Sequence, residues 1–480
     1  MSDTAEFDFI VIGGGSAGYA AAALGTALGM KTAVVEGAKE MGGLCILRGC
    51  MPSKTLIESA NRFMTLRRAK EYGLRAESIS VHGEEIIERK RRLIGEFADH
   101  RRQQLECGPF ELARGWAKFL DAETIEVAGA ERRRLRGKSF LIATGSALKF
   151  VDVPGLAETG FLSSDQVLES MRIPKSVIVL GAGPIALEFA HYYSALGSEV
   201  TIIQRGMQVL RDMDGDVAGA ASEALCARGV KLYLGTTMTR VEKSAAGKRV
   251  VFQHEGKEQS AEAEEIIYGL GRAPNLDGLA LEAAGVKGSH GRLGTNANQQ
   301  TNVPHIFAAG DAAGPHEIVH IAIQQAEVAT RNAHRLVQGS TEALEEMDYR
   351  LKLFIAFTEP QVAAIGFSER ELMTANAPYM VARYPFCDLG KALVRGESEG
   401  FVKLIANTKN CEILGAAAVG PEAGELIHEL SAAMYFRATA HDLLRIPHYH
   451  PTLSEIWTYP AEELVMAEPG GAETQSAPRI

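Results

Sequence analysis

The feature that most constrains this chain is a glycine-rich turn between an apolar strand pattern and an apolar helix pattern. Phe7–Ile12 has the continuous apolar character of a buried parallel strand, and Ala20–Leu28 has that of a helix. Between them lie the glycines of a G-x-G-x-x-G spacing, Gly13, Gly15 and Gly18. Glycine permits the tight turn and the close approach of a pyrophosphate, and the helix start offers N–H groups to it. Glu36 ends the next predicted strand, where its carboxylate can accept a ribose hydroxyl.

The same strand, turn and helix return about 170 positions later, so the chain carries two such units. Ser176–Leu180 is the second apolar strand, and Val200–Gln204 is the strand that follows its helix. The turn contains Gly181 and Gly183, with Ala186 in the third position, a replacement that this fingerprint permits. Two nucleotide-binding units predict two bound dinucleotides.

The length of 480 residues predicts a multidomain globular protein of about three units. The charge balance, 50 Lys and Arg against 60 Asp and Glu, gives a net charge of −10. This argues against nucleic-acid and membrane partners, because neither a phosphate backbone nor an anionic lipid surface is attracted to it. No stretch of about 18 apolar residues predicts a membrane span. The N-terminus is acidic where a signal peptide would be basic, so a cytoplasmic protein is expected.

Two cysteines, Cys45 and Cys50, lie five positions apart just beyond the first nucleotide unit. On a regular helix this offset is a rise of roughly 7.5 Å, beyond the ~7 Å limit between the Cα atoms of a disulfide. A bonded pair therefore requires a distorted turn, for which Gly49 gives the backbone freedom, and Pro52 suits the first turn of a following helix. The dipole of such a helix favours a thiolate. A metal site would need two further ligands that the segment does not offer, so no metal is predicted; a passive buried pair is the other alternative.

The segment around this pair, GGLCILRGCMPSK, resembles that of the pyridine nucleotide–disulfide oxidoreductases, which include dihydrolipoamide dehydrogenase, glutathione reductase and mercuric reductase. The family's usual segment is close to GGTCLNVGCIPSK. The resemblance implies an α/β fold with two Rossmann-like nucleotide-binding domains, for FAD and NAD(P), and a C-terminal α+β dimerisation domain. The implied divisions are 1–150 (FAD domain with the redox-active disulfide), 151–276 (NAD(P) domain), 277–345 (return to the FAD domain), 346–466 (dimerisation domain) and 467–480 (a flexible tail).

The resemblance also implies roles for individual residues. Cys45 would exchange with the substrate and Cys50 would face the flavin, while Lys54 would pair with Glu188 near it. The segments Ala143-Thr144-Gly145 and 302–311 would close over FAD, with Asp311 on the ribityl chain. Further implied cofactor contacts are Gly43, Thr144, Gly145, Gly271 and Gly310.

The second nucleotide unit resembles the family's nicotinamide nucleotide site. Its second strand ends at Gln204, where family members that use NADH usually have Glu. The two nearby guanidiniums, Arg205 and Arg211, offer bidentate sites for a 2′-phosphate. NADPH is therefore favoured, and NADH remains the alternative if both arginines are ordinary solvated charges.

Near the C-terminus, PHYHPTLSE resembles the family's H-x-H-P-T-x-x-E motif. His450 would be the general base for a thiol, and Glu455 would orient its imidazole. His448 is expected only to line the pocket. In this family the motif reaches the active site of the other subunit, which implies an obligate homodimer.

The expected activity is electron transfer between NAD(P)H and a small-molecule or protein-bound dithiol or disulfide, with dihydrolipoamide dehydrogenase as the leading resemblance. A glutathione-reductase-type enzyme is the alternative. Mercury reduction is disfavoured because the closing residues lack a cysteine pair and no extra N-terminal metal-binding domain is present. A flavin diaphorase or oxidase, or a redox-inactive flavoprotein, would leave the cysteine and histidine motifs unexplained.

The remaining features receive plain structural interpretations. The charges of the long helical stretch Glu84–Glu106 are expected to form a solvated face. Four cysteines and two histidines are expected to be ordinary core or surface residues: Cys107, Cys226, Cys387, Cys411, His316 and His320.

Overall fold

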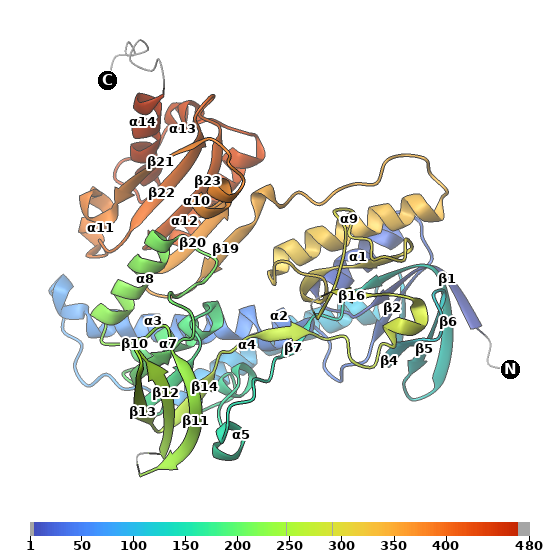
Figure 1. The fold of residues 1–480 in the computed structure, drawn as a ribbon, viewed down its shortest axis with the longest axis horizontal. Helices are drawn as coiled ribbons and strands as arrows, with labels where there is room; N and C mark the ends of the chain where they lie inside the picture. Colours follow the sequence, from blue (N-terminus) through green and yellow to red (C-terminus); the bar gives the residue numbers. More distant parts are fainter. Residues whose placement is uncertain (1–3, 246, 290, 469–480) are drawn as a thin grey trace. The chain divides into compact units, whose positions relative to one another are not determined.

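The computed structural model describes residues 4–468 except Ala246 and His290, and it does not describe the side chain of Ser289. The chain forms two compact units (Figure 1). Unit 1 comprises residues 1–56, 84–150 and 271–348, and unit 2 comprises residues 57–83, 151–270 and 349–480. Among the described residues, no helix is both long enough and apolar enough to cross a membrane.

Unit 1 contains a seven-stranded sheet in the order β3-β2-β1-β6-β5-β4, with β18 also paired to β6. Its strands are β1 (Thr4–Ile12), β2 (Thr32–Glu36), β3 (Glu111–Arg114), β4 (Trp116–Phe119), β5 (Thr124–Ala128), β6 (Arg132–Ile142) and β18 (Ile306–Ala308). Strands β1, β2, β3, β6 and β18 are parallel, whereas β4 and β5 are antiparallel. The carboxyl ends of the parallel strands therefore meet at one edge, which is where such sheets bind ligands.

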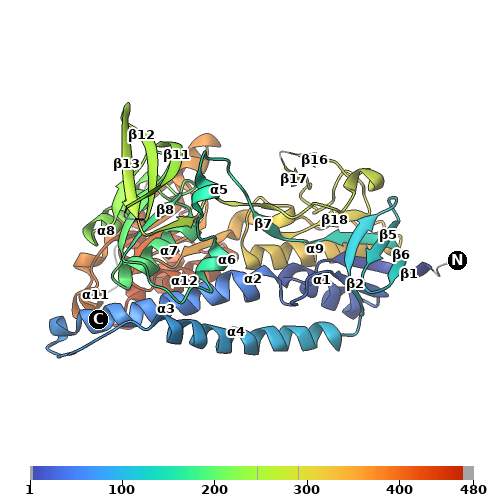
Figure 2. The ribbon, with the colours of Figure 1, turned by 90° about the horizontal axis from the view of Figure 1, so that it is seen from below.

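Two helices of unit 1, α1 (Ser16–Ala27) and α9 (Val319–Val337), lie side by side in both views (Figures 1 and 2). They share a core with the apolar strand residues, and their contacts are made by small side chains such as Ala21, Ala22, Ala326 and Ala329. The other helices of this region are α2 (Gly43–Arg48), the first seven residues of α3 (Cys50–Arg67) and α4 (Gly83–Glu106). Two short antiparallel pairs complete it: β7 (Ser146–Leu148) with β15 (Arg272–Pro274), and β16 (Gly288–Ser289) with β17 (Arg292–Leu293).

Unit 2 contains the second nucleotide unit on a four-stranded parallel sheet, in the order β10-β9-β8-β14. The strands are β8 (Ser176–Leu180), β9 (Glu199–Ile203), β10 (Lys231–Tyr233) and β14 (Glu265–Tyr268). The helices are α5 (Leu156–Thr159), α6 (Ser164–Val167), α7 (Pro184–Ala195) and α8 (Gly215–Ala227). A separate antiparallel sheet (Figure 2) is formed by β11 (Thr237–Ser244), β12 (Gly247–His254) and β13 (Lys257–Ala263).

The C-terminal part of unit 2 is a five-stranded antiparallel sheet in the order β19-β20-β23-β22-β21. The strands are β19 (Leu353–Ala356), β20 (Gln361–Gly366), β21 (Tyr379–Pro385), β22 (Phe401–Asn407) and β23 (Ile413–Gly420). Helix α12 (Ala423–Tyr435) packs on β20 and β23, and α14 (Thr458–Ala467) packs on β21 and β22. The shorter helices are α10 (Glu369–Thr374), α11 (Gly390–Arg395) and α13 (Ala440–Arg445).

The predicted fold class is confirmed, since both parallel nucleotide-binding sheets and the C-terminal α+β part are present. Ala467, the first residue of the predicted tail, is the last residue of α14. Residues 469–480 of that tail lie outside the described residues.

Candidate active site

The glycine turn after β1 is shaped by backbone contacts that leave no room for side chains. Gly13 has a φ of +108°, and a Cβ there would lie 2.4 Å from the carbonyl oxygen of Ala143. A Cβ on Gly18 would lie 1.8 Å from the carbonyl oxygen of Gly13. Gly15 is the N-cap of α1 and, like any glycine, brings no side chain to the helix start. The first N–H groups of α1 are thus presented at a bare turn, the arrangement that binds a phosphate.

Glu36 is fixed at the end of β2 by two backbone hydrogen bonds. The Gly14 N–H donates to Oε2 at 2.9 Å, and the Ala38 N–H donates to Oε1 at 2.8 Å. Each carboxylate oxygen keeps a further acceptor position. The carboxylate is therefore oriented in advance beside the glycine turn, as expected for an acceptor of ribose hydroxyls.

Asp311, in the short 3-10 helix Gly310–Ala312 after β18, belongs to a small polar network that no local sequence pattern indicates. The Ser146 hydroxyl donates to Asp311 Oδ2 at 2.6 Å. Arg272 in turn donates from Nε to the Ser146 hydroxyl at 2.9 Å and from Nη2 to its carbonyl at 2.8 Å. The three predicted glycines of this region all have positive φ: Gly145 (+69°), Gly271 (+109°) and Gly310 (+70°). Ser146 and Arg272 thus hold the carboxylate that is predicted to contact the ribityl chain.

Arg101 corrects the prediction of a solvated charged face on α4. Most charges of this helix are exposed, but Lys90 is buried and Arg101 is half-buried. The Arg101 guanidinium carbon lies 4.1 Å from the centre of the Tyr19 ring on α1. Its Nε and Nη1 atoms are buried and have no hydrogen-bond partner among the described residues. Burial lowers the pKa of this guanidinium.

These features fit a bound dinucleotide in unit 1. Buried donors without partners are rare in folded proteins, and each calls for an acceptor. Besides the two Arg101 atoms, the hydroxyl of Thr144, one of the predicted cofactor contacts, is buried without a partner among the described residues. A phosphate-containing ligand at the bare glycine turn would supply such acceptors.

The cysteine segment has the distorted geometry that the spacing required. Helix α2 ends at Arg48, Gly49 adopts φ −131° and ψ −115°, and α3 begins at Cys50. A Cβ on Gly49 would lie 2.9 Å from the Leu44 carbonyl oxygen, which shows how tightly the chain folds back at this break. Cys45 and Cys50 are both half-buried thiols. The pKa of the Cys45 thiol is raised, mainly by its hydrogen bond with Cys50 and secondly by burial.

The helix that carries Cys45 packs directly on the first glycine turn. Gly43, its first residue, has a φ of +74°, and a Cβ there would lie 2.5 Å from the Cα of Gly15. No side chain separates the two segments at this point. The structure therefore brings the cysteine pair and the nucleotide-binding turn together within unit 1.

The predicted pair of Lys54 and Glu188 falls on different units. Lys54 lies on α3 one turn beyond Cys50, in unit 1. Glu188 lies on α7 of unit 2, where it is buried and its Oε1 accepts a hydrogen bond from the Phe357 N–H at 3.1 Å. The pairing of the two side chains stays a prediction.

The second glycine turn has the same bare backbone as the first. Gly181 has a φ of +97°, and a Cβ there would lie 2.5 Å from the carbonyl oxygen of Gly269. Gly183 is the N-cap of α7, whose first residue is Pro184. The N–H groups at the start of α7 are therefore presented in the same way as those of α1.

The side chains beside this second turn differ from those of the first. Gln204 Nε2 donates to the Gln208 carbonyl at a long 3.5 Å. Arg205 and Arg211 are exposed, and Arg211 Nε lies 3.5 Å from a carboxylate oxygen of the exposed Asp212. The loop that carries Arg211 is tied to the turn, because the Leu210 N–H donates to the Ala182 carbonyl at 2.9 Å. Two exposed cations thus lie beside the turn, and no carboxylate stands at the strand end.

His450 and Glu455 form the predicted pair in the C-terminal part of unit 2. His450 Nδ1 lies 2.9 Å from Glu455 Oε2. The imidazole is 75% exposed, whereas the carboxylate side chain is only 9% exposed. Glu455 Oε1 is buried without a hydrogen-bond partner among the described residues. A buried carboxylate thus holds an imidazole whose other face is open to an incoming group.

His448 is buried and hydrogen-bonded within the protein, unlike the exposed His450. Its Nε2 lies 2.6 Å from Glu429 Oε1, and its Nδ1 lies 2.9 Å from the Ile446 carbonyl. The side chain is 7% exposed. Both ring nitrogens are engaged, so this histidine supports the segment that presents His450.

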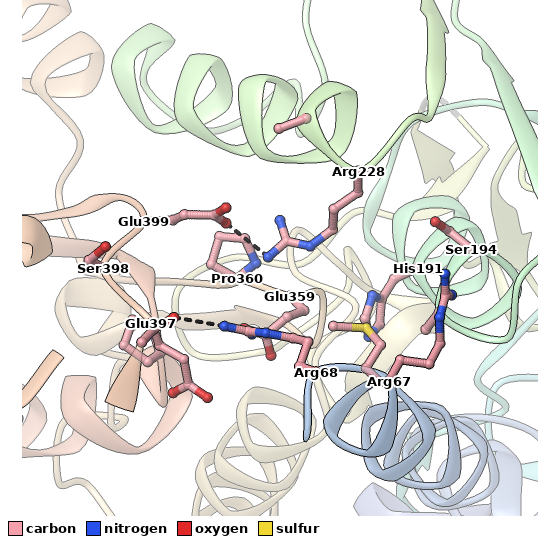
Figure 3. A pocket seen from close by; sticks show the side chains of 15 residues that line it. Arg67, Arg68, His191, Ser194, Arg228, Glu359, Pro360, Glu397, Ser398 and Glu399 are labelled. Atoms are coloured by element: carbon pink, nitrogen blue, oxygen red, sulfur yellow. Dashed lines mark hydrogen bonds and ion pairs between the residues drawn. The ribbon is translucent and has the colours of Figure 1, made fainter. Parts of the chain in front are cut away.

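A separate cavity of about 480 Å³ lies within unit 2. Figure 3 shows Glu397 and Glu399 on one side of it and His191 and Arg67 on the other. Burial raises the pKa of Glu359, which also lines it, to about 7. None of the site residues predicted from the sequence lines this cavity, so it is distinct from the residues described above.

Unit 1 and unit 2 together define a class: proteins with two dinucleotide-binding turns, one of which supports a close pair of cysteines. Residues 7–332 match the family described as pyridine nucleotide-disulphide oxidoreductase, and residues 354–461 match the dimerisation domain of the same family. The chain belongs to this family of flavoprotein disulfide oxidoreductases, which act with NAD(P)H.

Similar proteins carry two kinds of name. The chain is 32% identical to a dihydrolipoyl dehydrogenase of Chlamydia trachomatis over 96% of its own length and 97% of that protein. It is 34% identical to the dihydrolipoyl dehydrogenase of Thermus scotoductus, over 95% and 97%. It is also 32% identical to a mercuric reductase of Staphylococcus aureus, over 91% of this chain and 79% of that protein. The flavoprotein disulfide reductase RclA from Escherichia coli shares the fold, with a TM-score of 0.82 at 23% identity, over 95% of this chain and 99% of that one.

Proposed function

We propose that this chain transfers electron pairs between NADPH and a dithiol or disulfide substrate of the dihydrolipoyl type, through Cys45 and Cys50. The observation that carries the proposal is the packing of Gly43 against Gly15, which supports the cysteine segment directly on a nucleotide-binding turn. A passive buried pair would have no need of this contact. The full-length likeness to dihydrolipoyl dehydrogenases supports the choice of a dithiol.

Glu36, Asp311, Thr144 and Arg101 would hold FAD in unit 1 through its ribose, ribityl and phosphate groups. Bound FAD would pass an electron pair between the nicotinamide and the cysteine pair. The glycine turn would bind the pyrophosphate through backbone N–H groups. The network of Ser146 and Arg272 would fix Asp311 before the cofactor binds.

The cysteines would exchange with the substrate in two balanced steps. One substrate sulfur attacks Cys45 Sγ of the Cys45–Cys50 disulfide, so a mixed disulfide forms and Cys50 leaves as a thiolate. The second substrate sulfur then displaces Cys45 and closes the substrate disulfide. The dithiol has lost two electrons and two protons, and NADP⁺ takes the electron pair with one proton while the other is released. Disulfide reduction is the same sequence in reverse.

His450 would accept the proton of the attacking thiol. Its Nδ1–H donates to Glu455, which leaves Nε2 as the basic nitrogen and stabilises the imidazolium that forms. The buried carboxylate cannot easily turn away from the imidazole, so the base stays oriented.

The 75% exposure of this imidazole and the match to the dimerisation domain support a homodimer, in which His450 of the partner subunit serves each cysteine pair. Cys45→Ser and His450→Ala chains, each inactive alone, would then regain activity when dissociated and reassembled together. Random pairing would restore about a quarter of the wild-type activity. Failure to regain activity, with mixed dimers present, would contradict the shared site.

The preference for NADPH rests on Arg205, Arg211 and the missing acid at Gln204. A 2′-phosphate can accept hydrogen bonds from both guanidiniums. A 2′-hydroxyl at this strand end would face the Gln204 amide instead of the carboxylate that usually accepts its hydrogen bond. We propose a cytoplasmic location for this protein, because six cysteines are few for a secreted disulfide framework in a chain of 480 residues.

The test is an anaerobic titration of the purified flavoprotein with NADPH and, separately, with NADH. Wild-type protein should develop a long-wavelength thiolate-to-flavin absorption after two-electron reduction, faster with NADPH. Cys45→Ser cannot form the disulfide, so it should show this absorption before any reduction, lose it as NADPH reduces the flavin, and have no substrate turnover. Direct bleaching of the flavin in wild type would place the cysteines outside the electron path. Steady-state assays with dihydrolipoamide, oxidised glutathione and Hg²⁺ then separate the substrate classes, since mercuric reductases are equally similar in sequence.

A further inference from the structure

Three side chains of unit 2 that can each bind a metal converge at one place in the C-terminal part. Cys411 lies in the turn between β22 and β23, His441 lies in the first turn of α13, and Glu468 directly follows α14. Their donor atoms all lie within 4.8 Å of one another. His441 Nε2 and Glu468 Oε2 are 2.8 Å apart.

Backbone hydrogen bonds fix the first two of these residues in place. The Cys411 N–H donates to the Asn407 carbonyl at 3.0 Å and closes the turn. The Ala440 N–H, at the start of α13, donates to the Cys411 carbonyl at 2.9 Å. His441 is therefore held next to Cys411, although the two are 30 positions apart in the sequence.

The three groups have the chemistry of a zinc ligand set. Zinc binds thiolate, imidazole and carboxylate together, and sites with three protein ligands keep a fourth position for water. Cys411 is completely buried, whereas the side chains of His441 and Glu468 are 35% and 24% exposed. An ion can thus enter from solvent past His441 and Glu468 and bind the buried Cys411 sulfur at the inner end of the site.

A second cluster in unit 2 shows what the first one lacks. Asp214, Asp216 and Glu369 also lie within 4.8 Å of one another, but Lys403 Nζ sits among them at 2.7, 2.8 and 3.0 Å. This acidic cluster already has a cation of its own. Among the described residues, His441 is the only ion-pair partner of Glu468.

We propose that Cys411, His441 and Glu468 bind one divalent transition-metal ion of zinc-like preference. The Cys411 S–H bond breaks as the sulfur–metal bond forms, and its proton goes to solvent. His441 contributes the Nε2 lone pair of its neutral Nδ1–H tautomer in place of its hydrogen bond to Glu468. One thiolate and one carboxylate then balance the two charges of the ion. The ion would fasten the β22–β23 turn to the beginning of α13 and the end of α14, a structural role apart from the proposed redox site.

The test uses the full-length flavoprotein with Cys45→Ser and Cys50→Ser, so that the redox pair cannot bind the metal. After removal of metals with a chelator, the protein is dialysed against zinc, and zinc per chain is measured by mass spectrometry. We expect one zinc per chain. Cys411→Ser and, separately, Glu468→Gln in this background should weaken zinc binding more than about 10-fold, since even second-shell changes cost about that much. Cys387→Ser, an exposed cysteine, is the matched control and should leave the stoichiometry unchanged.

Cobalt(II) gives an independent readout in the red, beyond the absorption of the flavin. Tetrahedral cobalt bound by a thiolate should produce bands there in the parent and the Cys387→Ser control, and these bands should be lost in Cys411→Ser. Glu468 is partly exposed and directly follows α14, so Glu468→Gln changes no core residue. Circular dichroism and flavin content check that this variant is folded. Absence of bound zinc in the parent, or equal binding in all variants, would mean that the three side chains form only a hydrogen-bonded contact.

Discussion

The two glycine turns have the same backbone plan. The Gly13 N–H donates to the Val35 carbonyl at 2.8 Å, and the Gly181 N–H donates to the Ile203 carbonyl at 2.9 Å. In each turn a Cβ on this glycine would meet the carbonyl of the residue that follows the neighbouring strand, at 2.4 Å for Ala143 and 2.5 Å for Gly269. Both turns therefore offer a pyrophosphate the same set of backbone groups.

The turns differ in where the small residues stand and in what ends the second strand. Ala186 occupies the position of Gly18, and Gly269 stands where the first turn has Ala143; a Cβ on Gly269 would lie 2.7 Å from that of Ala186. The second strand ends in Glu36 in one unit and leads into Gln204 in the other. The two turns thus share the backbone groups that suit any pyrophosphate, and they differ in single side chains, on which the proposed choice of nucleotide rests.

The largest effect is expected from Gly18→Ala, which makes the first turn resemble the second at its third position. The new Cβ would lie 1.8 Å from the Gly13 carbonyl oxygen. This should cost about 3 kcal/mol or more, or about 100-fold or more in flavin affinity. Flavin content per chain after gel filtration measures it. Ala186→Gly, the reverse change in the second turn, should keep its flavin; equal loss in both variants would break the comparison.

Glu36→Ala should weaken FAD binding less severely. The variant loses the ribose acceptor and leaves the Gly14 and Ala38 N–H groups without their partner. Hydrogen bonds to charged groups are worth about 2 kcal/mol, so the dissociation constant of FAD should rise about 30-fold. Fluorescence titration of the apoprotein with FAD measures this. Glu40→Ala, at an exposed pair with Arg48, is the control and should have no effect on FAD binding.

Gln204→Glu should give the second unit the acid of the first and move the proposed nucleotide preference from NADPH toward NADH. The added carboxylate can accept the 2′-hydroxyl and repels a 2′-phosphate. The ratio of kcat/KM for NADH to that for NADPH should rise about 10-fold, equivalent to about 1.4 kcal/mol. Stopped-flow measurement of flavin reduction at several concentrations of each nucleotide checks that the dissociation constant changes and the limiting rate of reduction does not. An unchanged ratio would show that the strand end does not determine nucleotide choice here.

The smallest effect is expected from Gly269→Ala. This change gives the second turn the alanine that the first turn has at the equivalent position, Ala143. Contact with Ala186 should destabilise unit 2 by about 1 kcal/mol. The midpoint of urea unfolding, followed by circular dichroism, measures it. Adding Ala186→Gly should restore only the part of the loss that comes from the Ala186 Cβ, because the new Cβ would still lie 2.9 Å from the Leu180 carbonyl oxygen. Additive losses in the double variant would show that the two positions do not share this space.

Local patterns in the sequence were sufficient for the features that depend on neighbours in the chain. The apolar strands, the glycine turns and the break between Cys45 and Cys50 follow from residue order alone, and β1, β2, β8, β9 and α4 appear where they were expected. The hydrogen bond between His450 and Glu455 also lies within one short motif.

Contacts between distant segments could not be predicted in this way. The charge pattern of α4 does not indicate which arginine turns inward, because Arg101 is buried by Tyr19 from another helix. The bond from Ser146 to Asp311 spans 165 positions, and the grouping of Cys411 with His441 and Glu468 depends on the C-terminal fold. A short polar residue directly after the Ala-Thr-Gly segment was the one available signal for Ser146.

The contact between Gly43 and Gly15 would couple flavin binding to the proposed oxidation and reduction of Cys45 and Cys50. If the oxidised and reduced forms of the cysteine pair place α2 differently against the turn, they must bind the flavin with different affinities. Thermodynamic linkage then requires the reverse: the flavin shifts the reduction potential of the pair by the same free energy. An apoprotein and a flavin-loaded protein in one glutathione buffer should therefore reach different ratios of disulfide to dithiol at Cys45 and Cys50.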